Sequence, residues 1–545
     1  MQGLRVPGAP RPYHMLYALR RTHSLELSSA YGALLAARGS TKGRLYASIR
    51  VGNHNFDNVI DGGLDDDAEE LESAEWVDAP HDLDPLGLQI ALWKLTQVKF
   101  DEAVEDYWDH RKAMVSEYLR DEVGALSRDK PAKHREPMSE TTFPRAEWEA
   151  MLCSLSRRFL DHPEIYDPGI ELYAERVQRW TVTSDGGEVC TEDTYIGLAI
   201  EGWVLTENDG VYVHGARELY LRAVEEVPPE ETLAKLVQEV IDELRDLRKA
   251  PSPGAYIGPA LLSGQSASTL FHEALGHRLE GERLVARGES KTFAHKRGER
   301  ILPAGLDVYD DPTIERFAGQ ALWGSYRVDD EGIPATRAHL VSDGVLRGFL
   351  QSRAPIPGSA TSNGHARHDG FQRPMARMGT LVVEARGGSE SWEALMSRLI
   401  ELAQAQGRKH GLIISRVRAG ETSTSDYDFQ AFKGELSEVY LIDVKTRAMT
   451  RIRDVELIGT PLSALQRIVG HGGEVGVDQG HCYAESGSVP VSGIAPALLL
   501  SELELQQKST TGYHEPLLPP PFADDGSRGR RGKLRERGRR RPKGS

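Results

Sequence analysis

The sequence predicts an α+β fold in more than one domain, and two observations support this. Long segments with apolar residues three or four apart alternate with short apolar runs that are separated by turn signals such as Asp185-Gly186-Gly187. These are the periodicities of amphipathic helices and of antiparallel strands. A Pro-Ser-Pro-Gly stretch at 251–254 marks a junction near the middle of the 545-residue chain. At roughly 150 residues per domain, we expect two domains and a tail, with boundaries 1–250, 251–522 and 523–545.

The N-terminal domain is predicted to be α+β and to contain an antiparallel meander. Helices are expected at 88–126 and 145–161, and a third at 229–249, between two prolines before it and Pro251 after it. Between the second and third helices, three strand-like runs are separated by Asp-Gly-Gly and Asn-Asp-Gly turns. Such turns are typical of β-hairpins.

The C-terminal domain is predicted to be mostly β, with one helix that carries the chemistry. The strand-like run AYIGPALLS precedes this helix, which is expected at 266–280. Short strand patterns follow, with a turn about every ten residues and one more helix at 391–405. The proline-rich run EPLLPPPF at 515–522 ends the domain.

Charge is distributed unevenly along the chain. The last twenty residues hold ten Lys or Arg and one Glu, which gives +9, so the remaining 525 residues carry −25 of the total of −16. The tail has almost no apolar residue, and we expect it to be disordered. Because the body is acidic and no aromatic residues lie among the tail arginines, nucleic acid is an unlikely partner.

Several protein classes are excluded by composition. Apolar residues make up 39% of the chain and charged residues 27%, which is typical of a globular protein rather than a disordered one. The longest uncharged stretch, 250–272, is rich in Pro, Gly and Ser, so it does not predict a membrane helix. No signal-peptide core is visible near the first residue, and we expect a cytoplasmic protein without a membrane segment.

The three cysteines exclude a disulfide framework. Cys153 lies in an amphipathic helix pattern and Cys190 follows a hairpin turn, so both are expected to be packing residues. Cys482 lies among glycines just before a strand pattern, where backbone can approach closely.

The segment SASTLFHEALGHRLEGE is the most informative in the chain. On a helical wheel its apolar residues form one stripe, while His272, Glu273, Gly276, His277 and Glu280 lie on the opposite face. Two imidazoles beside a carboxylate indicate a metal site, and neutral imidazole suits Zn²⁺. The histidines are five residues apart, about 140° on an ideal helix, so they converge only if the helix loosens at the glycine. The alternative is two surface histidines on an exposed helix face.

A catalytic zinc takes three protein ligands and leaves one position open. Cys482 is the preferred third ligand. The sequence leaves other candidates open, namely Glu280, Glu282, His295, His471 and His481.

HEALGHRLEGE resembles the HExxxH motif of the TldD/PmbA metallopeptidase family, and CYAESGSVPVSG resembles the family's C-terminal cysteine segment. Further similar segments, DDPT, DDEGIPAT, GVLRGFLQSR, SNGHAR and PMARM, appear between them in the family's order. The segment SRVRAGETSTSD replaces a more glycine-rich family stretch that lines a cleft.

The resemblance implies one Zn²⁺ per chain, held by His272, His277 and Cys482, with Glu273 as general base. It implies hydrolysis of peptide bonds in short or unfolded peptides inside a dimer cleft, as a homodimer or as a heterodimer with a PmbA-type subunit. A competing hypothesis is a non-catalytic partner subunit of such a complex, which the presence of His272 and Glu273 disfavours.

Four further residues are candidates for supporting roles. Glu280 is expected to orient a histidine ligand; the alternative is a solvated charge. Asn363, His365 and Arg367 are candidates for binding the substrate backbone, although SNGHAR also fits a simple turn.

Overall fold

The computed structural model describes residues 3–59, 76–116, 123–139, 142–289, 291–387, 389–425 and 431–508. The predicted basic tail, 523–545, lies outside these described residues. Within them, no helix combines the length and the apolar character that crossing a membrane requires.

The first half of the chain builds one eight-stranded sheet in the order β3-β2-β1-β6-β7-β5, with β4 on β2 and β8 on β7. Its two longest pairings are the hairpins β1–β2 and β6–β7, and β1 joins them through β6. The elements are β1 (Pro12–Ala30), β2 (Ala33–Asn53), β3 (Phe56–Asp57), β4 (Trp76–Asp78), α1 (Pro85–Ser116), β5 (Lys133–Arg135), α2 (Arg145–Ser156), β6 (Ile165–Thr183), β7 (Glu188–Leu205), β8 (Tyr212–Leu221) and α3 (Glu230–Lys249).

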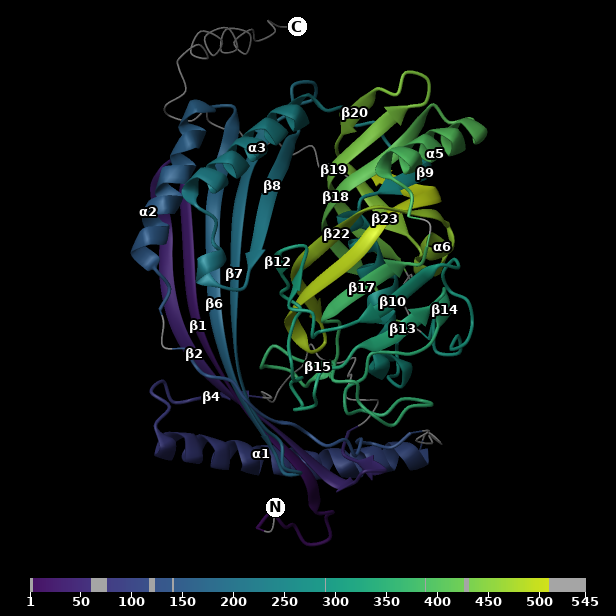
Figure 1. Cartoon of the computed structure of the whole chain (residues 1–545). Coiled ribbons are helices and arrows are strands. Elements are labelled where there is room, and N and C mark those ends of the chain that lie inside the picture. The colour runs from purple at the N-terminus through teal and green to yellow at the C-terminus, as the bar shows by residue number, and fades with distance from the viewer. Residues whose placement is uncertain are drawn as a thin grey trace, which may run out of the picture.

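Helices cover two separate regions of this sheet (Figure 1). α1 crosses one end of the sheet and packs on Met15 and Leu19 of β1. On the other end, α2 packs against Leu25 and Leu27 of the same strand, and α3 joins the same buried cluster through β7 and β8. Because alternate strand residues share a face, these four odd-numbered side chains show that the helices lie on one side of the sheet.

The second half builds an eleven-stranded mixed sheet in the order β14-β13-β10-β17-β23-β21-β19-β18-β9, with β20 on β19 and β22 on β23. A further pairing between β23 and β9 closes five of these strands into a ring. The elements are β9 (Tyr256–Leu262), α4 (Gly264–Phe271), β10 (Leu306–Asp310), β11 (Arg316–Phe317), β12 (Gln320–Ala321), β13 (Ala338–Ser342), β14 (Val345–Leu346), β15 (Ala366–Arg367), β16 (Met375–Ala376), β17 (Thr380–Ala385), α5 (Trp392–Ala405), β18 (His410–Thr422), β19 (Phe432–Asp443), β20 (Met449–Ile452), β21 (Val455–Gly459), α6 (Pro461–Gln466), β22 (Ile468–Ala484) and β23 (Gly487–Gln507).

α4 is the central helix of this half. Its apolar side chains Leu270 and Phe271, with Ala274 and Leu275 just after it, belong to the largest buried core. The helix contacts β22 and β23 on one side and β18 on another. It therefore begins inside the fold, at Ser263, whose Oγ accepts a hydrogen bond from the Ser266 N–H at 3.2 Å.

The predicted α+β class is confirmed, and the meander is β6–β7–β8. The sequence did not indicate the hairpin β1–β2, because Arg20, Arg21 and His23 interrupt its apolar pattern. It also did not indicate the parallel pairs β9–β18 and β17–β23, since periodicity within a strand says nothing about its neighbour. The predicted division at 250/251 falls between α3 and β9, and we retain it as a proposal.

Glu282 gives this fold a pH-dependent stability. Its carboxyl is 1% exposed, accepts the Ala376 N–H at 3.0 Å and bonds the Ser352 hydroxyl. Burial raises the pKa of Glu282 to about 7. A folded-state pKa above the unfolded value adds stability that is full below pH 4.5 and is lost as the pH rises through 7, about 3 kcal/mol in all. Glu282→Gln removes this contribution.

We expect the melting temperature of the wild type to fall relative to that of Glu282→Gln between pH 5 and pH 8. Thermal melts of both proteins across this range measure the difference. Parallel curves would contradict the assignment of a raised pKa to this carboxyl.

Candidate metal centre

The helix that carries the motif changes its geometry at the motif. α4 ends at Phe271, one π turn spans His272–Gly276, and a 3₁₀ turn spans His277–Leu279. In the π turn the His277 N–H donates to the His272 carbonyl, an i→i+5 bond. This wider turn brings residues five apart to the same side, and the two imidazole centroids lie 4.9 Å apart.

The prediction of one regular helix over 266–280 is therefore wrong in its second half. The predicted placement of Gly276 on the same face as the histidines, opposite the apolar stripe, also needs correction. A Cβ at this position would lie 2.1 Å from the Met378 Sδ, so the glycine permits packing against the core. Such π turns are frequent at functional sites.

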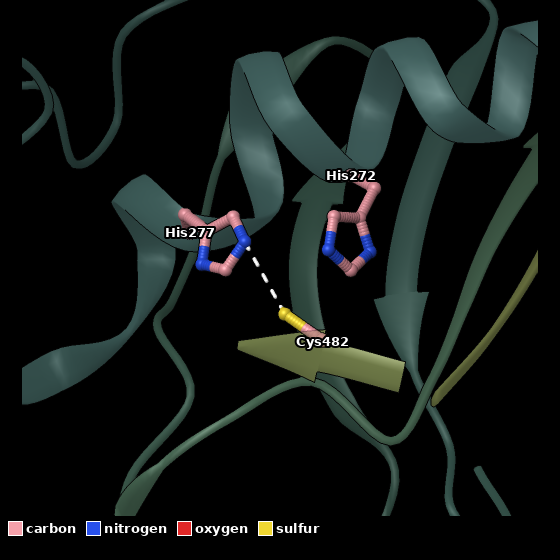
Figure 2. Close-up of side chains that lie close together, drawn as sticks. All are labelled: His272, His277 and Cys482. Atoms are coloured by element: carbon pink, nitrogen blue, oxygen red, sulfur yellow. Dashed lines mark hydrogen bonds between the residues drawn. The ribbon is translucent and has the colours of Figure 1, made fainter. Parts of the chain in front are cut away.

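Cys482 on β22 completes the cluster. The ligand atoms of His272, His277 and Cys482 all lie within 4.8 Å of one another. The Cys482 Sγ is 3.3 Å from the His277 Nε2 (Figure 2). His277 is 6% exposed and Cys482 5%, which contradicts the alternative of two surface histidines.

The donor set fits a zinc ion. Imidazole nitrogen and thiolate sulfur are the ligands that Zn²⁺ prefers, and three protein ligands with one open position are the pattern of catalytic rather than structural sites. Burial raises the pKa of the Cys482 thiol, but the positive charges of His277, Arg377 and His272 outweigh burial and hold it well below its usual range. The low pKa of Cys482 favours the thiolate, which is the form of cysteine that binds metal ions.

Glu273 lies beside the cluster. Its Oε1 is 4.0 Å from the His272 Nε2, and its side chain is almost fully buried. Burial raises the pKa of Glu273 despite the opposing charges of His272 and His277. Gly420 of β18 makes room for it, because a Cβ there would lie 2.4 Å from the Glu273 Oε1.

A cavity of about 460 Å³ opens onto these groups. Its walls come from the motif helix, from β18 and from β22, and Tyr220 of β8 contributes from the first half of the chain. The cluster therefore faces a cavity to which both halves of the molecule contribute.

Glu280, the residue predicted to orient a histidine, contacts the outer ring nitrogen of His277. It is fully buried, and its Oε1 is 3.2 Å from the His277 Nδ1. Burial opposes ionisation, but His277, Arg283 and Arg377 lower the pKa of Glu280 to about 2. The carboxylate is thus ionised, and its bond to Nδ1 leaves Nε2 directed at Cys482.

Arg377 links both sides of the cluster. Its Nε is 3.4 Å from the Glu280 Oε1, and the same guanidinium donates to the Cys482 carbonyl at 2.7 Å. It also donates to Ser486 Oγ and to the Gly487 carbonyl, both at 2.9 Å. One buried cation thereby positions the histidine's partner and the strand end that carries the thiol.

Asp478 lines the cavity and was not predicted. It accepts hydrogen bonds from the Gln265 Nε2 at 2.8 Å and from the Thr269 Oγ1 at 2.9 Å. Its signal in the sequence is its position four residues before Cys482, because strand residues four apart share a face. Gln265 also pairs with the Val417 N–H and carbonyl, which draws β18 towards the helix.

The predicted substrate residues Asn363, His365 and Arg367 do not line this cavity. His365 is fully buried, with its Nε2 3.2 Å from the Asp310 Oδ1. Asn363 bonds the backbone of Gln351 and Phe349, and Arg367 the carbonyl of Pro490. These side chains hold the surrounding loops together.

The alternative third ligands do not enter the cluster in the described part of the chain. His481 lines the cavity beside Cys482, but Glu280 and Glu282 make the contacts described above. His295 is exposed and His471 lies close to Gly305. Cys190 is buried and Cys153 is half-buried, and neither belongs to the cluster.

Comparisons with known proteins agree on one family. Residues 253–507 match the model of the PmbA/TldA metallopeptidase C-terminal domain. The chain is 30% identical over 249 residues to a metalloprotease TldD homolog of Haemophilus influenzae, which is 45% of this chain and 47% of that protein. It is 22% identical over 352 residues to a zinc metalloprotease TldD homolog of Saccharolobus solfataricus, 63% of this chain and 72% of that protein.

A solved structure extends the likeness to the first half. TldE from Thermococcus kodakarensis superimposes with a TM-score of 0.58 at 16% identity, over 91% of this chain and 97% of that chain. At this identity the likeness concerns the fold alone. The match with the Haemophilus protein spans about half of that relative's length.

Replacing Glu280 with glutamine keeps the shape of the side chain and removes its charge. Because orienting partners of metal ligands are typically worth 10- to 100-fold in metal affinity, we expect Glu280→Gln to weaken Zn²⁺ binding by about that factor. A chelator competition titration measures it. Glu289→Gln is the matched control, since Glu289 also bonds Arg283 at 2.8 Å but does not contact His277. Equal loss in both variants would contradict a specific role for Glu280.

Proposed function

Since residues 253–507 match the model of the PmbA/TldA metallopeptidase C-terminal domain, we propose that this chain belongs to the TldD/PmbA family and is a zinc-dependent metallopeptidase. The observation that carries this is the placement of two imidazoles and one thiol within 4.8 Å of one another, beside the carboxyl of Glu273 and at a cavity. We propose His272, His277 and Cys482 as the ligands of one Zn²⁺ per chain.

The ion, when bound, polarises the scissile carbonyl and makes water acidic enough to attack near neutral pH. Glu273 takes the proton of the attacking water on its carboxylate as the new C–O bond forms. It then delivers that proton to the amide nitrogen as the C–N bond breaks. Burial raises the pKa of Glu273, which suits a group that both accepts and returns a proton.

The substrate proposed is a short or unfolded peptide. A cavity of about 460 Å³ accommodates a few side chains but not a folded domain. We further propose that the chain acts in the cytoplasm, as a homodimer or as a heterodimer with a PmbA-type subunit. The alternative of a non-catalytic partner subunit is disfavoured, because that role requires neither the general base nor a complete ligand set.

The proposed general base is tested by Glu273→Gln. The amide cannot accept the proton of water, so we expect peptidase activity on an unstructured peptide to fall at least about 10²-fold, with one Zn²⁺ retained per chain. Activity assays with metal analysis measure both. Glu401→Gln, on the exposed side of α5, is the control and should match the wild type. Full activity in Glu273→Gln would reject the mechanism.

The proposed thiolate ligand is tested by Cys482→Ala. We expect the bound zinc and the activity to be lost together, because two imidazoles alone do not complete a catalytic site. Cys190→Ala removes another buried thiol and should retain both. Zinc content that is unchanged in Cys482→Ala would remove this residue from the ligand set.

A further inference from the structure

A second cavity, of about 670 Å³, lies on the sheet of the first half. Its floor is formed by β1, β2 and β6, and its walls by residues that precede α1 and α2. The strands that form this floor are covered by α1 towards one end and by α2 towards the other (Figure 1). Among the described residues, the groups proposed for catalysis take no part in its lining.

The cavity follows from the sequence of β1. Leu19 packs under α1 and Leu25 under α2, and the two side chains between them on the same face are Arg21 and His23. On β2, the residues opposite Arg21 and His23 are Gly43 and Thr41. Because this stretch of the sheet offers polar and small side chains rather than apolar ones, neither α1 nor α2 packs on it.

Two arginines in the cavity each have a buried Nε that lacks a hydrogen-bond partner in the described part of the chain. Arg176 is 8% exposed, and the nearest carboxylate oxygen, on Glu192, is 3.9 Å from its Nε. Glu192 already accepts from the Gln178 Nε2 and from the Ser139 N–H. The Nε of Arg21 is buried and likewise unpaired. A buried N–H without an acceptor is costly, and the ion pair of Arg176 with Glu192 is long, so this arrangement favours an additional, external anion.

The strand register places these two groups together. Arg21 lies opposite Gln178, and His23 opposite Arg176, which makes the two arginines diagonal neighbours within the reach of long side chains. The described residues that line the cavity include no Asp or Glu, in a chain whose net charge is −16. Burial and the charges of Arg21 and Arg176 lower the pKa of His23, as expected in a positive field.

Apolar side chains complete the cavity. Trp180 of β6 and Leu25 of β1 contribute, and Phe143 lies with its ring centroid 5.3 Å from the Arg176 guanidinium carbon. Cavities of this size with a few converging polar groups are typical of small-molecule sites. A cavity that combines two arginines with apolar side chains fits a ligand with a negatively charged end and an apolar body.

We propose that this cavity binds a small organic anion, whose carboxylate or phosphate is held by Arg21 and Arg176 while its aromatic or aliphatic body packs on Trp180 and Phe143. Guanidinium groups suit both oxyanions, because their N–H donors match the spacing of the two oxygens. The site is independent of the proposed peptidase centre.

The test is calorimetric titration of the full-length protein with benzoate, phenyl phosphate and inorganic phosphate. We expect one site per chain for at least one of the aromatic anions, with affinity reduced at least about tenfold in Arg21→Gln through loss of a charge-assisted contact. Arg21 is only half-buried, so this variant should fold. Arg38→Gln is the control: it removes one charge from an exposed residue of β2 outside the cavity and should bind as the wild type does.

Binding of benzoate alone would identify a carboxylate site and binding of phenyl phosphate alone a phosphate site. Each supports the proposal if it depends on Arg21. Absence of binding by all three anions at about 10 mM would overturn it, as would equal binding by Arg21→Gln or equal weakening by Arg38→Gln. Glu273→Gln should bind as the wild type does, so failure here and failure of the peptidase proposal are distinguishable.

Discussion

The candidate metal centre depends on one backbone hydrogen bond, from the His277 N–H to the His272 carbonyl, which makes the turn between them a π turn. In a regular α-helix, residues five apart diverge by about 140°, and His277 would point away from Cys482. The wider turn also places Gly276 in contact with Met378 in the core. The same π turn therefore allows both the close packing of the core and the convergence of the two histidines.

Buried charged residues stabilise the cluster on the side of His277 that faces away from Cys482. The Oε2 of Glu280 is hydrogen-bonded to both His277 and Arg283, and Arg283 forms a bidentate pair with Glu485. Arg377 joins Glu280 to the carbonyl of Cys482. Because each ion is paired and hydrogen-bonded, the cost of burying it is offset, and the ligands are oriented by a rigid framework rather than by the loops alone.

The first half of the molecule shapes the cavity without supplying a ligand. Trp323 of the second half packs against Tyr195 and Tyr220, and its Nε1 donates to the Leu221 carbonyl at 3.0 Å. This contact places Tyr220 in the cavity wall. The cavity that contains Arg21 and Arg176 lies on the face of this sheet that the helices partly cover. Because alternate strand residues point to opposite faces, the same strands contribute residues to both faces of the sheet.

The sequence by itself determined the α+β class and, through HEALGH and the segment around Cys482, the candidate ligands and base, because those depend on residue type and local spacing. It left open which of several groups joins the histidines and whether Asn363 binds substrate or belongs to a turn, and it placed Gly276 on the same face as the histidines. The tertiary structure decided these points, since Cys482 and Asp478 reach the helix only through the pairing of β22 with β23. Arg21 and Arg176 likewise become neighbours only through the register of β1 and β6, a long-range contact that no local pattern encodes.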